Sequence, residues 1–212
     1  LGRGPMINLW GRDTTQDAPG TTHISIIDQA GNAVSMTATV EAAFGSSRWA
    51  AGFLLNNELT DFAFIPSLNG LPVANAPAAN KRPRSSMSPT LVFNESDQLF
   101  MVTGSPGGNS IIAYVAKTLM AVLDRGMSAQ DAAGLPNIIA RGEAVNVEVD
   151  REGGQEIANL LKEAGYNVRE RGGENSGLHV IVVRNTGLEG GADPRREGAA
   201  LYLPPVEEIE RE

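Results

Sequence analysis

Residues 17–41 read DAPGTTHISIIDQAGNAVSMTATVE, and this stretch decides the fold. Two runs rich in β-branched residues, 22–28 and 33–40, flank a tetrapeptide in which Gly31 and Asn32 can adopt positive φ, so the stretch predicts a β-hairpin. On its second strand, polar and apolar side chains alternate between the two faces. Ser35, Thr37 and Thr39 share one face, and Val34, Met36, Ala38 and Val40 share the other.

The bond between Gly20 and Thr21 has two interpretations. In the first, Pro19 and Gly20 form a turn and Thr21 simply opens the strand. In the second, the bond is cut and Thr21 becomes a new N-terminus, whose α-amino group titrates near neutral pH and serves as the base for its own hydroxyl. Because Gly-Thr pairs are common, the motif alone favours the plain strand start and leaves the second interpretation open.

Composition excludes several classes of function. The 212 residues can bury a sizeable core, and no run approaches the roughly 18 apolar residues of a membrane span. A net charge of −8 argues against a nucleic-acid partner. The absence of cysteine excludes disulfides, thiolate zinc sites and cysteine nucleophiles, and two histidines, His23 and His179, are too few for a histidine-based metal site. We therefore expect no metal and no cofactor.

The rest of the chain predicts hairpins followed by helices. Residues 1–20 are rich in Gly, Pro and Asp and indicate a surface segment, and their start, LGRGPMINLW, suggests the interior of a longer chain. Residues 53–57 predict a short strand, 66–83 a long loop with four prolines, and 89–108 a second hairpin. Further strands are expected at 144–149, 166–171 and 178–185.

Three helices are expected in the second half. Residues 110–125 place Ile112, Val115, Leu119 and Val122 on one face, and a capping box from Ser128 to Asp131 begins a short helix. Residues 155–166 form a third helix that ends at Gly165, with Ile157, Leu160 and Leu161 inward. This order predicts an α+β protein in which largely antiparallel sheets are covered by helices.

Three motifs could carry chemistry, and each also has an ordinary structural interpretation. TGSPGGNS, 103–110, is a strand-to-helix turn, a phosphate site without the P-loop lysine, or an oxyanion hole built from the N–H groups of Gly107 and Gly108. NNELTDF, 56–62, is a solvated loop or a carboxylate pair, Glu58 and Asp61, that grips an ammonium. In NKRPRSSMSPT, 80–90, serines beside basic residues bind a carboxylate or cap a strand. For His23, a structural role is favoured over a catalytic one.

In this order, TTHISIIDQAGNAVSMTATVE, GFLLNNELTDF, NKRPRSSMSPT and TGSPGG resemble the small subunit of γ-glutamyltransferases, also called γ-glutamyl transpeptidases. ADPRREGAA, 192–200, is similar to the DPR ending of that family, so the resemblance covers about Thr21 to Ala200. It implies the N-terminal nucleophile hydrolase fold, an αββα sandwich of which this chain supplies part. It also implies a precursor that cuts itself, with 1–20 ending the large subunit and 21–212 forming the small catalytic subunit.

The resemblance also implies roles for the catalytic residues. Thr21 matches the nucleophile, and the bond from Gly20 to Thr21 matches the cleavage site. Thr39 matches a second threonine whose hydroxyl supports the nucleophile. Gly107 and Gly108 match the oxyanion hole.

Substrate-binding residues follow in the same way. Glu58 and Asp61 match the residues that hold the α-amino group of the substrate, and Glu41 stands where the best-known members have an asparagine near that amine. Ser85 and Ser86 match residues near the α-carboxylate. The arginine that grips this carboxylate belongs to the large subunit, and the loop 66–83, without Tyr or Trp, is shorter than the lid-bearing versions.

The resemblance implies an enzyme that transfers or hydrolyses the γ-glutamyl group of glutathione and similar donors, with water, amino acids or peptides as acceptors. Its partner would be the large subunit from the same precursor, and its compartment the periplasm or the cell exterior. One alternative is an acylase for glutaryl amides such as cephalosporin side chains, which would not need the pair Glu58 and Asp61. Another is a non-catalytic homologue whose bond between Gly20 and Thr21 stays intact.

Overall fold

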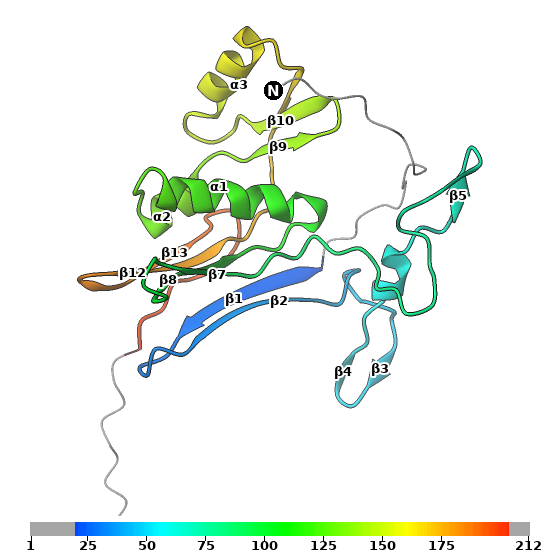
Figure 1. Ribbon diagram of the computed structural model, residues 1–212, viewed down its shortest axis with the longest axis horizontal. Coiled ribbons are helices and arrows are strands. Elements are labelled where there is room, and N and C mark those ends of the chain that lie inside the picture. The colour runs from blue at the N-terminus through cyan, green and yellow to red at the C-terminus, as the bar shows by residue number, and fades with distance from the viewer. Residues whose placement is uncertain (1–19, 204–212) are drawn as a thin grey trace, which may run out of the picture. The chain divides into compact units, whose positions relative to one another are not determined.

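The computed structural model describes residues 20–203, which divide into two compact units (Figure 1). Unit 1 contains Gly20 and Thr39–Ser86, and unit 2 contains Thr21–Ala38 and the chain from Met87 onward. None of the helices in residues 20–203 has the length and apolar composition that crossing a bilayer requires. Of the predicted surface segment 1–20, residues 1–19 lie outside the described residues.

Unit 2 is built in layers. Its central sheet has the order β13-β12-β8-β7 and is antiparallel throughout. One face contacts strand β1 of the hairpin, and helices α1 and α2 lie on the other (Figure 1). The bounds are β1 Thr21–Ile27, β2 Ala33–Thr39, β7 Thr90–Phe93, β8 Leu99–Gly104, α1 Ile111–Leu123, α2 Ala129–Gly134, β12 His179–Arg184 and β13 Gly187–Ala192. The chain thus supplies two sheet layers and one helical layer, and both predicted hairpins are confirmed.

The hairpin turns its polar face, not its apolar face, toward the sheet. His23 is buried, with Nδ1 at 2.8 Å from Thr37 Oγ1 and Nε2 at 3.1 Å from Ser25 Oγ. Ser35 Oγ donates to the Thr103 carbonyl at 2.9 Å. Burial, aided by the nearby charge of His179, lowers the pKa of His23 to about 4, so its ring is neutral and structural.

The opposite face of the hairpin is apolar and exposed. Its members are Ile24, Ile26, Val34 and Met36, each between 39% and 50% exposed. A strand alternates its side chains strictly, so burying the polar row leaves the apolar row on the outside.

The core of unit 2 lies between the sheet and its helices. Met101, Val180 and Val182 from the sheet meet Tyr114 and Val122 from α1. The predicted capping box is confirmed, because the Ser128 hydroxyl accepts the N–H of Asp131 at 3.0 Å.

The predicted inward faces of two helices are partly wrong. In α1, Ile112 is 58% exposed, and the buried positions include Ile111, Tyr114 and Thr118. In α3 (Gly154–Glu163), Leu160 is 57% exposed and Ala158 is buried. Each helix packs against neighbouring strands. The side chains that face those strands are buried, and they are not always the largest apolar side chains of the helix.

A second sheet of unit 2 has the order β11-β10-β9, with α3 packed against β10 and β11. Its strands are β9 Ile138–Arg141, β10 Ala144–Glu148 and β11 Val168–Arg171. β11 runs parallel to β10, while β9 is antiparallel. Strand β9 and the glycine-rich β13 were not predicted.

Unit 1 consists of turns and very short elements. They are β3 Trp49–Ala50, β4 Phe53–Leu54, the 3₁₀ helix η1 Glu58–Asp61, β5 Ser67–Leu68 and β6 Leu71–Pro72. The predicted loop 66–83 therefore contains a small hairpin, turned by Asn69 and Gly70 at positive φ.

Candidate active site

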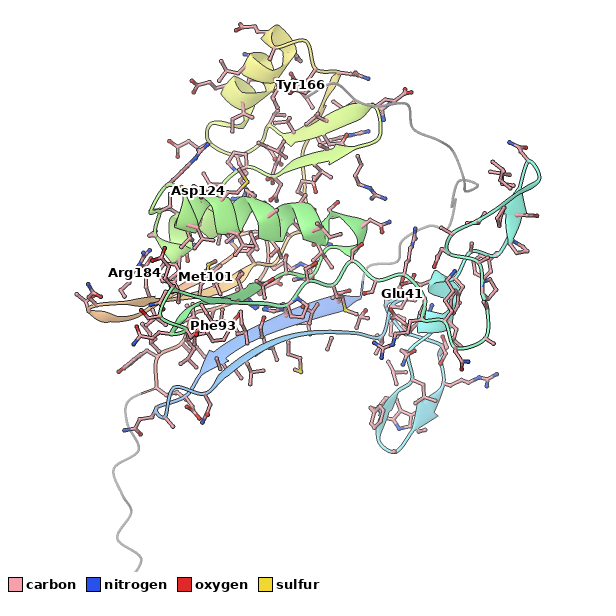
Figure 2. All side chains as sticks on the ribbon, in the orientation of Figure 1. Glu41, Phe93, Met101, Asp124, Tyr166 and Arg184 are labelled. Atoms are coloured by element: carbon pink, nitrogen blue, oxygen red, sulfur yellow. The ribbon has the colours of Figure 1, made fainter. Side chains whose placement is uncertain are left out.

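Three carboxylates meet in unit 1. Glu41, Glu58 and Asp61 each offer an oxygen, and these oxygens lie within 4.8 Å of one another. Figure 2 labels Glu41. Burial raises the pKa of Glu58, and the charge of Asp61 raises it further. Like charges held this close repel unless a cation lies between them, so the cluster is suited to bind an ammonium or a metal ion.

Asn57 builds this cluster. Its side-chain oxygen accepts the N–H of Ala42 at 2.9 Å, and its own N–H donates to the Val40 carbonyl at 3.2 Å. These bonds hold the residues on both sides of Glu41 against the start of η1, which carries Glu58. The Glu41 backbone has φ 72°, and its N–H donates to Thr39 Oγ1 at 2.8 Å.

Asn75 connects the carboxylate cluster to the segment that contains Ser85 and Ser86. The sequence did not reveal this role. Its side-chain nitrogen donates to the Asp61 carbonyl, and its side-chain oxygen accepts the N–H of Arg84 at 3.1 Å. Arg84 directly precedes Ser85, which is exposed, and Ser86, which is half-buried. An asparagine in a loop with two others carries no signal that would single it out.

Gly20 lies against the backbone of Glu41. A Cβ at Gly20 would overlap the Glu41 carbonyl oxygen, so only glycine fits there.

In unit 2, Thr21 opens strand β1 and is half-buried. Gly107 and Gly108 form the turn between β8 and α1, with φ 134° and 55°, and Gly108 begins the 3₁₀ helix η2 (Gly108–Ser110). A Cβ at Gly107 would overlap the ring of Tyr114 on α1. The turn therefore requires glycine at Gly107, and it leads directly into a helix N-terminus, where backbone N–H groups can stabilise negative charge.

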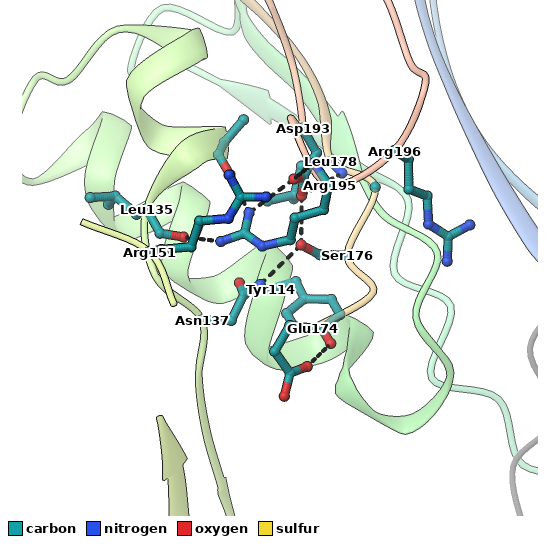
Figure 3. Close-up of polar contacts among 12 residues, drawn as sticks. Tyr114, Leu135, Asn137, Arg151, Glu174, Ser176, Leu178, Asp193, Arg195 and Arg196 are labelled. Carbon is teal, nitrogen blue, oxygen red and sulfur yellow. Dashed lines mark hydrogen bonds and ion pairs between the residues drawn. The ribbon is translucent and has the colours of Figure 1, made fainter. Parts of the chain in front are cut away.

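A buried arginine near the C-terminus organises unit 2 (Figure 3). Arg195 Nε donates to Glu148 at 2.8 Å, and Nη2 donates to the same carboxylate at 2.6 Å. Nη1 donates to Asp193 at 2.9 Å, and the carbonyls of Ala133 and Leu135 accept the other two N–H groups. All five N–H donors of Arg195 are thus engaged.

The network extends to the segment before β12. Asp193 accepts the hydroxyl of Ser176 at 2.5 Å, and Ser176 accepts the side-chain N–H of Asn137 at 2.9 Å. The sequence identified Asp193 and Arg195 only through the DPR resemblance, and Glu148 not at all, because partners 47 residues apart leave no local pattern.

The predicted site residues fall into two groups. Unit 1 holds Gly20 and the substrate-binding residues, and unit 2 holds Thr21 and the oxyanion glycines. Within unit 1 the structure brings the three carboxylates together. The full set is Gly20, Thr39, Glu41, Glu58, Asp61, Ser85 and Ser86 in unit 1, and Thr21, Gly107 and Gly108 in unit 2. Their catalytic and binding roles remain predictions.

Comparison with known proteins finds a family model, related sequences and related structures. The family model "Gamma-glutamyltranspeptidase" matches residues 5–203. The glutathione hydrolase proenzyme of Escherichia coli K12 is 35% identical over 182 residues, which cover 82% of this chain and 31% of that protein. The chain thus spans about a third of the length of this relative.

Solved structures share the fold. A γ-glutamyltranspeptidase from Pseudomonas nitroreducens, complexed with L-DON, has 31% sequence identity and a TM-score of 0.73, and covers 86% of this chain and 100% of its own. A cephalosporin acylase from Bacillus halodurans has 25% identity and a TM-score of 0.70, over 84% of this chain and 33% of its own. The α+β fold is therefore that of N-terminal nucleophile hydrolases of this type.

Proposed function

The chain belongs to the γ-glutamyltranspeptidase family, and from this premise we propose that it carries the nucleophile and the ammonium site for γ-glutamyl transfer and hydrolysis. Cleavage of the bond between Gly20 and Thr21 frees the α-amine of Thr21. The Thr21 hydroxyl then attacks the γ-carbonyl of a donor such as glutathione, and the α-amine takes the hydroxyl proton. The leaving amine receives that proton as it departs.

The resulting γ-glutamyl ester on Thr21 is resolved by water or by an acceptor amine. Negative charge develops on the former carbonyl oxygen in both steps, and the N–H groups of Gly107 and Gly108 are placed to stabilise it. In this proposal the Thr39 hydroxyl supports the nucleophile, and Ser85 and Ser86 contact the substrate α-carboxylate.

The carboxylate cluster is the observation that carries the proposal. A γ-glutamyl donor presents an α-ammonium, and the oxygens of Glu41, Glu58 and Asp61 lie close enough together to bind a cation. Charge-assisted hydrogen bonds from the ammonium to these oxygens would offset the repulsion among them. A glutaryl donor has no such ammonium and could make none of these charge-assisted bonds, which favours γ-glutamyl transfer over the acylase.

The exposed apolar face of the hairpin supports a partner from the same precursor. Ile24, Ile26, Val34 and Met36 form one contiguous row on β1 and β2, where an αββα sandwich has its second helical layer. The relatives are proenzymes about three times as long as the matched segment, so the remainder of the precursor can supply that layer. We further propose the periplasm or the cell exterior as the compartment.

Asp61→Asn tests the ammonium site. The variant should lose about 10- to 150-fold in kcat/KM with γ-glutamyl anilide, the size of a hydrogen bond to a charged group of about 1.5–3 kcal/mol. With glutaryl anilide, already poor in the wild type, its rate should stay level or rise. Steady-state kinetics on fully processed protein measures both.

Asp97→Asn is the matched control, because Asp97 lies in the exposed turn between β7 and β8. It should change neither rate. An equal loss on both substrates in Asp61→Asn would make Asp61 structural and would favour an acylase. If instead added divalent metal ions restored or raised activity through the cluster, its occupant would be a metal and not an ammonium.

Gly20→Ala tests the geometry of the cleavage site. The added methyl would overlap the Glu41 carbonyl, and overpacking of this kind costs roughly 1–3 kcal/mol, so self-cleavage should slow by about 5- to 150-fold if the cost falls on that step. Gly134→Ala is the control, since nothing lies within 4 Å of a Cβ there. Gel analysis of precursor decay gives both rates, and equal decay in the two variants would contradict the geometry.

A further inference from the structure

Arg195 and Arg196 are adjacent in sequence, but in the described part of the chain only Arg195 forms ion pairs with carboxylates. Arg195 is neutralised by Glu148 and Asp193. Arg196 instead donates to two backbone carbonyls, those of Thr21 at 3.3 Å and Asn175 at 2.9 Å. Its Nε is buried without a hydrogen-bond partner, and within residues 20–203 no carboxylate pairs with it. The positive charge of Arg196 is therefore uncompensated and is directed at Thr21.

The path of the Arg196 side chain is fixed. A Cβ at Gly177 would lie 2.8 Å from Arg196 Cδ and 2.8 Å from Pro106 Cγ, so the absence of a side chain at Gly177 makes room for Arg196. Pro106 directly precedes the oxyanion glycines. The neighbouring Arg195 network holds the backbone from which Arg196 extends (Figure 3). The space left by Gly177 and the two backbone carbonyls thus define the position of the guanidinium.

Covalent geometry then places this charge near the reacting amine. The nitrogen and the carbonyl oxygen of one residue are separated by two backbone atoms, which limits their distance to roughly 3.6 Å. With Arg196 Nη1 at 3.3 Å from the Thr21 oxygen, the guanidinium lies within about 7 Å of the Thr21 nitrogen. A like charge at this range disfavours the ammonium form of an amine.

We propose that Arg196 is a positioning residue whose uncompensated charge keeps the freed α-amine of Thr21 in its neutral, basic form near neutral pH. The inference rests on the proposed function, because only a cleaved Thr21 has this amine. It assigns a catalytic consequence to a residue whose hydrogen bonds go to backbone carbonyls.

His23, His179 and Glu174 are the other titratable groups of unit 2 that bear on the surroundings of Thr21. His23, on the same strand, has a pKa lowered to about 4 and is neutral. His179, on β12, donates its Nδ1 hydrogen to the His23 carbonyl at 2.6 Å. Glu174 accepts the Tyr114 hydroxyl, and its negative charge would act in the opposite direction. Of these groups, Arg196 is the one that donates a hydrogen bond to Thr21 itself.

The pH profile of kcat/KM tests the proposal in the full precursor after self-processing. Arg196→Met removes the charge and keeps the length, and Arg196→Lys keeps the charge. Arg169→Met, at an exposed position on β11, is the control that removes one charge elsewhere. In Arg196→Met the pKa of the Thr21 amine should rise by about one unit. The acidic limb of the pH profile of kcat/KM should therefore move to higher pH by the same amount.

The expected result is a loss of about tenfold at pH values below both pKa values, which vanishes above them. Arg196→Lys and Arg169→Met should keep the wild-type limb. A pH-independent loss in Arg196→Met, a limb in Arg196→Lys that matches Arg196→Met, or a failure of Arg196→Met to fold or self-process would overturn the proposal and make Arg196 structural. A wild type without Thr21-dependent turnover would instead refute the proposed function, and the inference with it.

Discussion

Thr21→Ala in the full precursor is expected to leave the bond between Gly20 and Thr21 intact and to abolish γ-glutamyl turnover. Alanine removes the hydroxyl that attacks the Gly20 carbonyl, and without cleavage no α-amine is released. Removing a nucleophile costs on the order of 10⁴- to 10⁶-fold in kcat, which is below detection for most assays. Intact-mass measurement of the two chains reports cleavage, and release of the anilide reports turnover.

Two companion variants make this result specific. Thr21→Ser keeps a hydroxyl and should be cut, with reduced turnover. Thr22→Ala alters the adjacent exposed threonine and should behave as the wild type. Cleavage of Thr21→Ala at the wild-type rate would remove Thr21 as the nucleophile. A wild type that stays uncut after long incubation would favour the non-catalytic homologue.

Gly107→Ala is expected to lower kcat by about 10²- to 10³-fold, or roughly 2.7–4 kcal/mol, in processed enzyme. The added Cβ would overlap the Tyr114 ring, and φ 134° is a conformation that alanine rarely adopts. The turn must therefore shift, which moves its N–H groups away from the position where negative charge develops. KM should change less than kcat, because the loss is confined to the transition state.

The control is Gly187→Ala, at the first residue of β13. Its φ of 125° imposes a similar backbone strain, but a Cβ there meets nothing within 4 Å. Comparing kcat between the two folded variants separates the effect of the substitution at Gly107 from the effect of backbone strain in general. A near-normal kcat in processed Gly107→Ala would show that these N–H groups do not form the oxyanion hole.

Local patterns predicted the elements of the fold well. The alternating strands of the first hairpin and the N-cap at Ser128 are determined by neighbours in sequence, and both are observed. The apolar face predicted for α1 is only partly correct, because Ile112 is exposed. The strands that escaped prediction lack such a pattern. Strand β13 has three glycines in six residues, and its place in the sheet is set by pairing with β12.

The orientation of the first hairpin was beyond sequence reasoning. Alternation separates a polar face from an apolar face, but it does not say which one meets the sheet. The structure buries the face with His23, whose ring fits against the sheet because Gly104 has no side chain. That complementarity joins residues 81 positions apart, so no window of sequence contains it.

The site shows the same division. Glu58 and Asp61 are neighbours in sequence and were predicted as a pair, whereas the addition of Glu41 to their cluster depends on hydrogen bonds made by Asn57. Arg196 likewise reaches Thr21 across 175 positions. Residue types and spacing can therefore indicate the chemistry of a site, while the groups that orient it emerge only from the folded chain.

The central claim is that Thr21 becomes covalently bonded to a γ-glutamyl group. Rapid quenching of the processed enzyme in acid during turnover, followed by intact-mass and peptide analysis, tests it directly. The proposal predicts that the fragment beginning with Thr21 gains the mass of one γ-glutamyl residue, that the label maps to Thr21, and that it disappears when an acceptor amine is added before the quench. A label on any other residue, or turnover without a labelled chain when deacylation limits the rate, would contradict it.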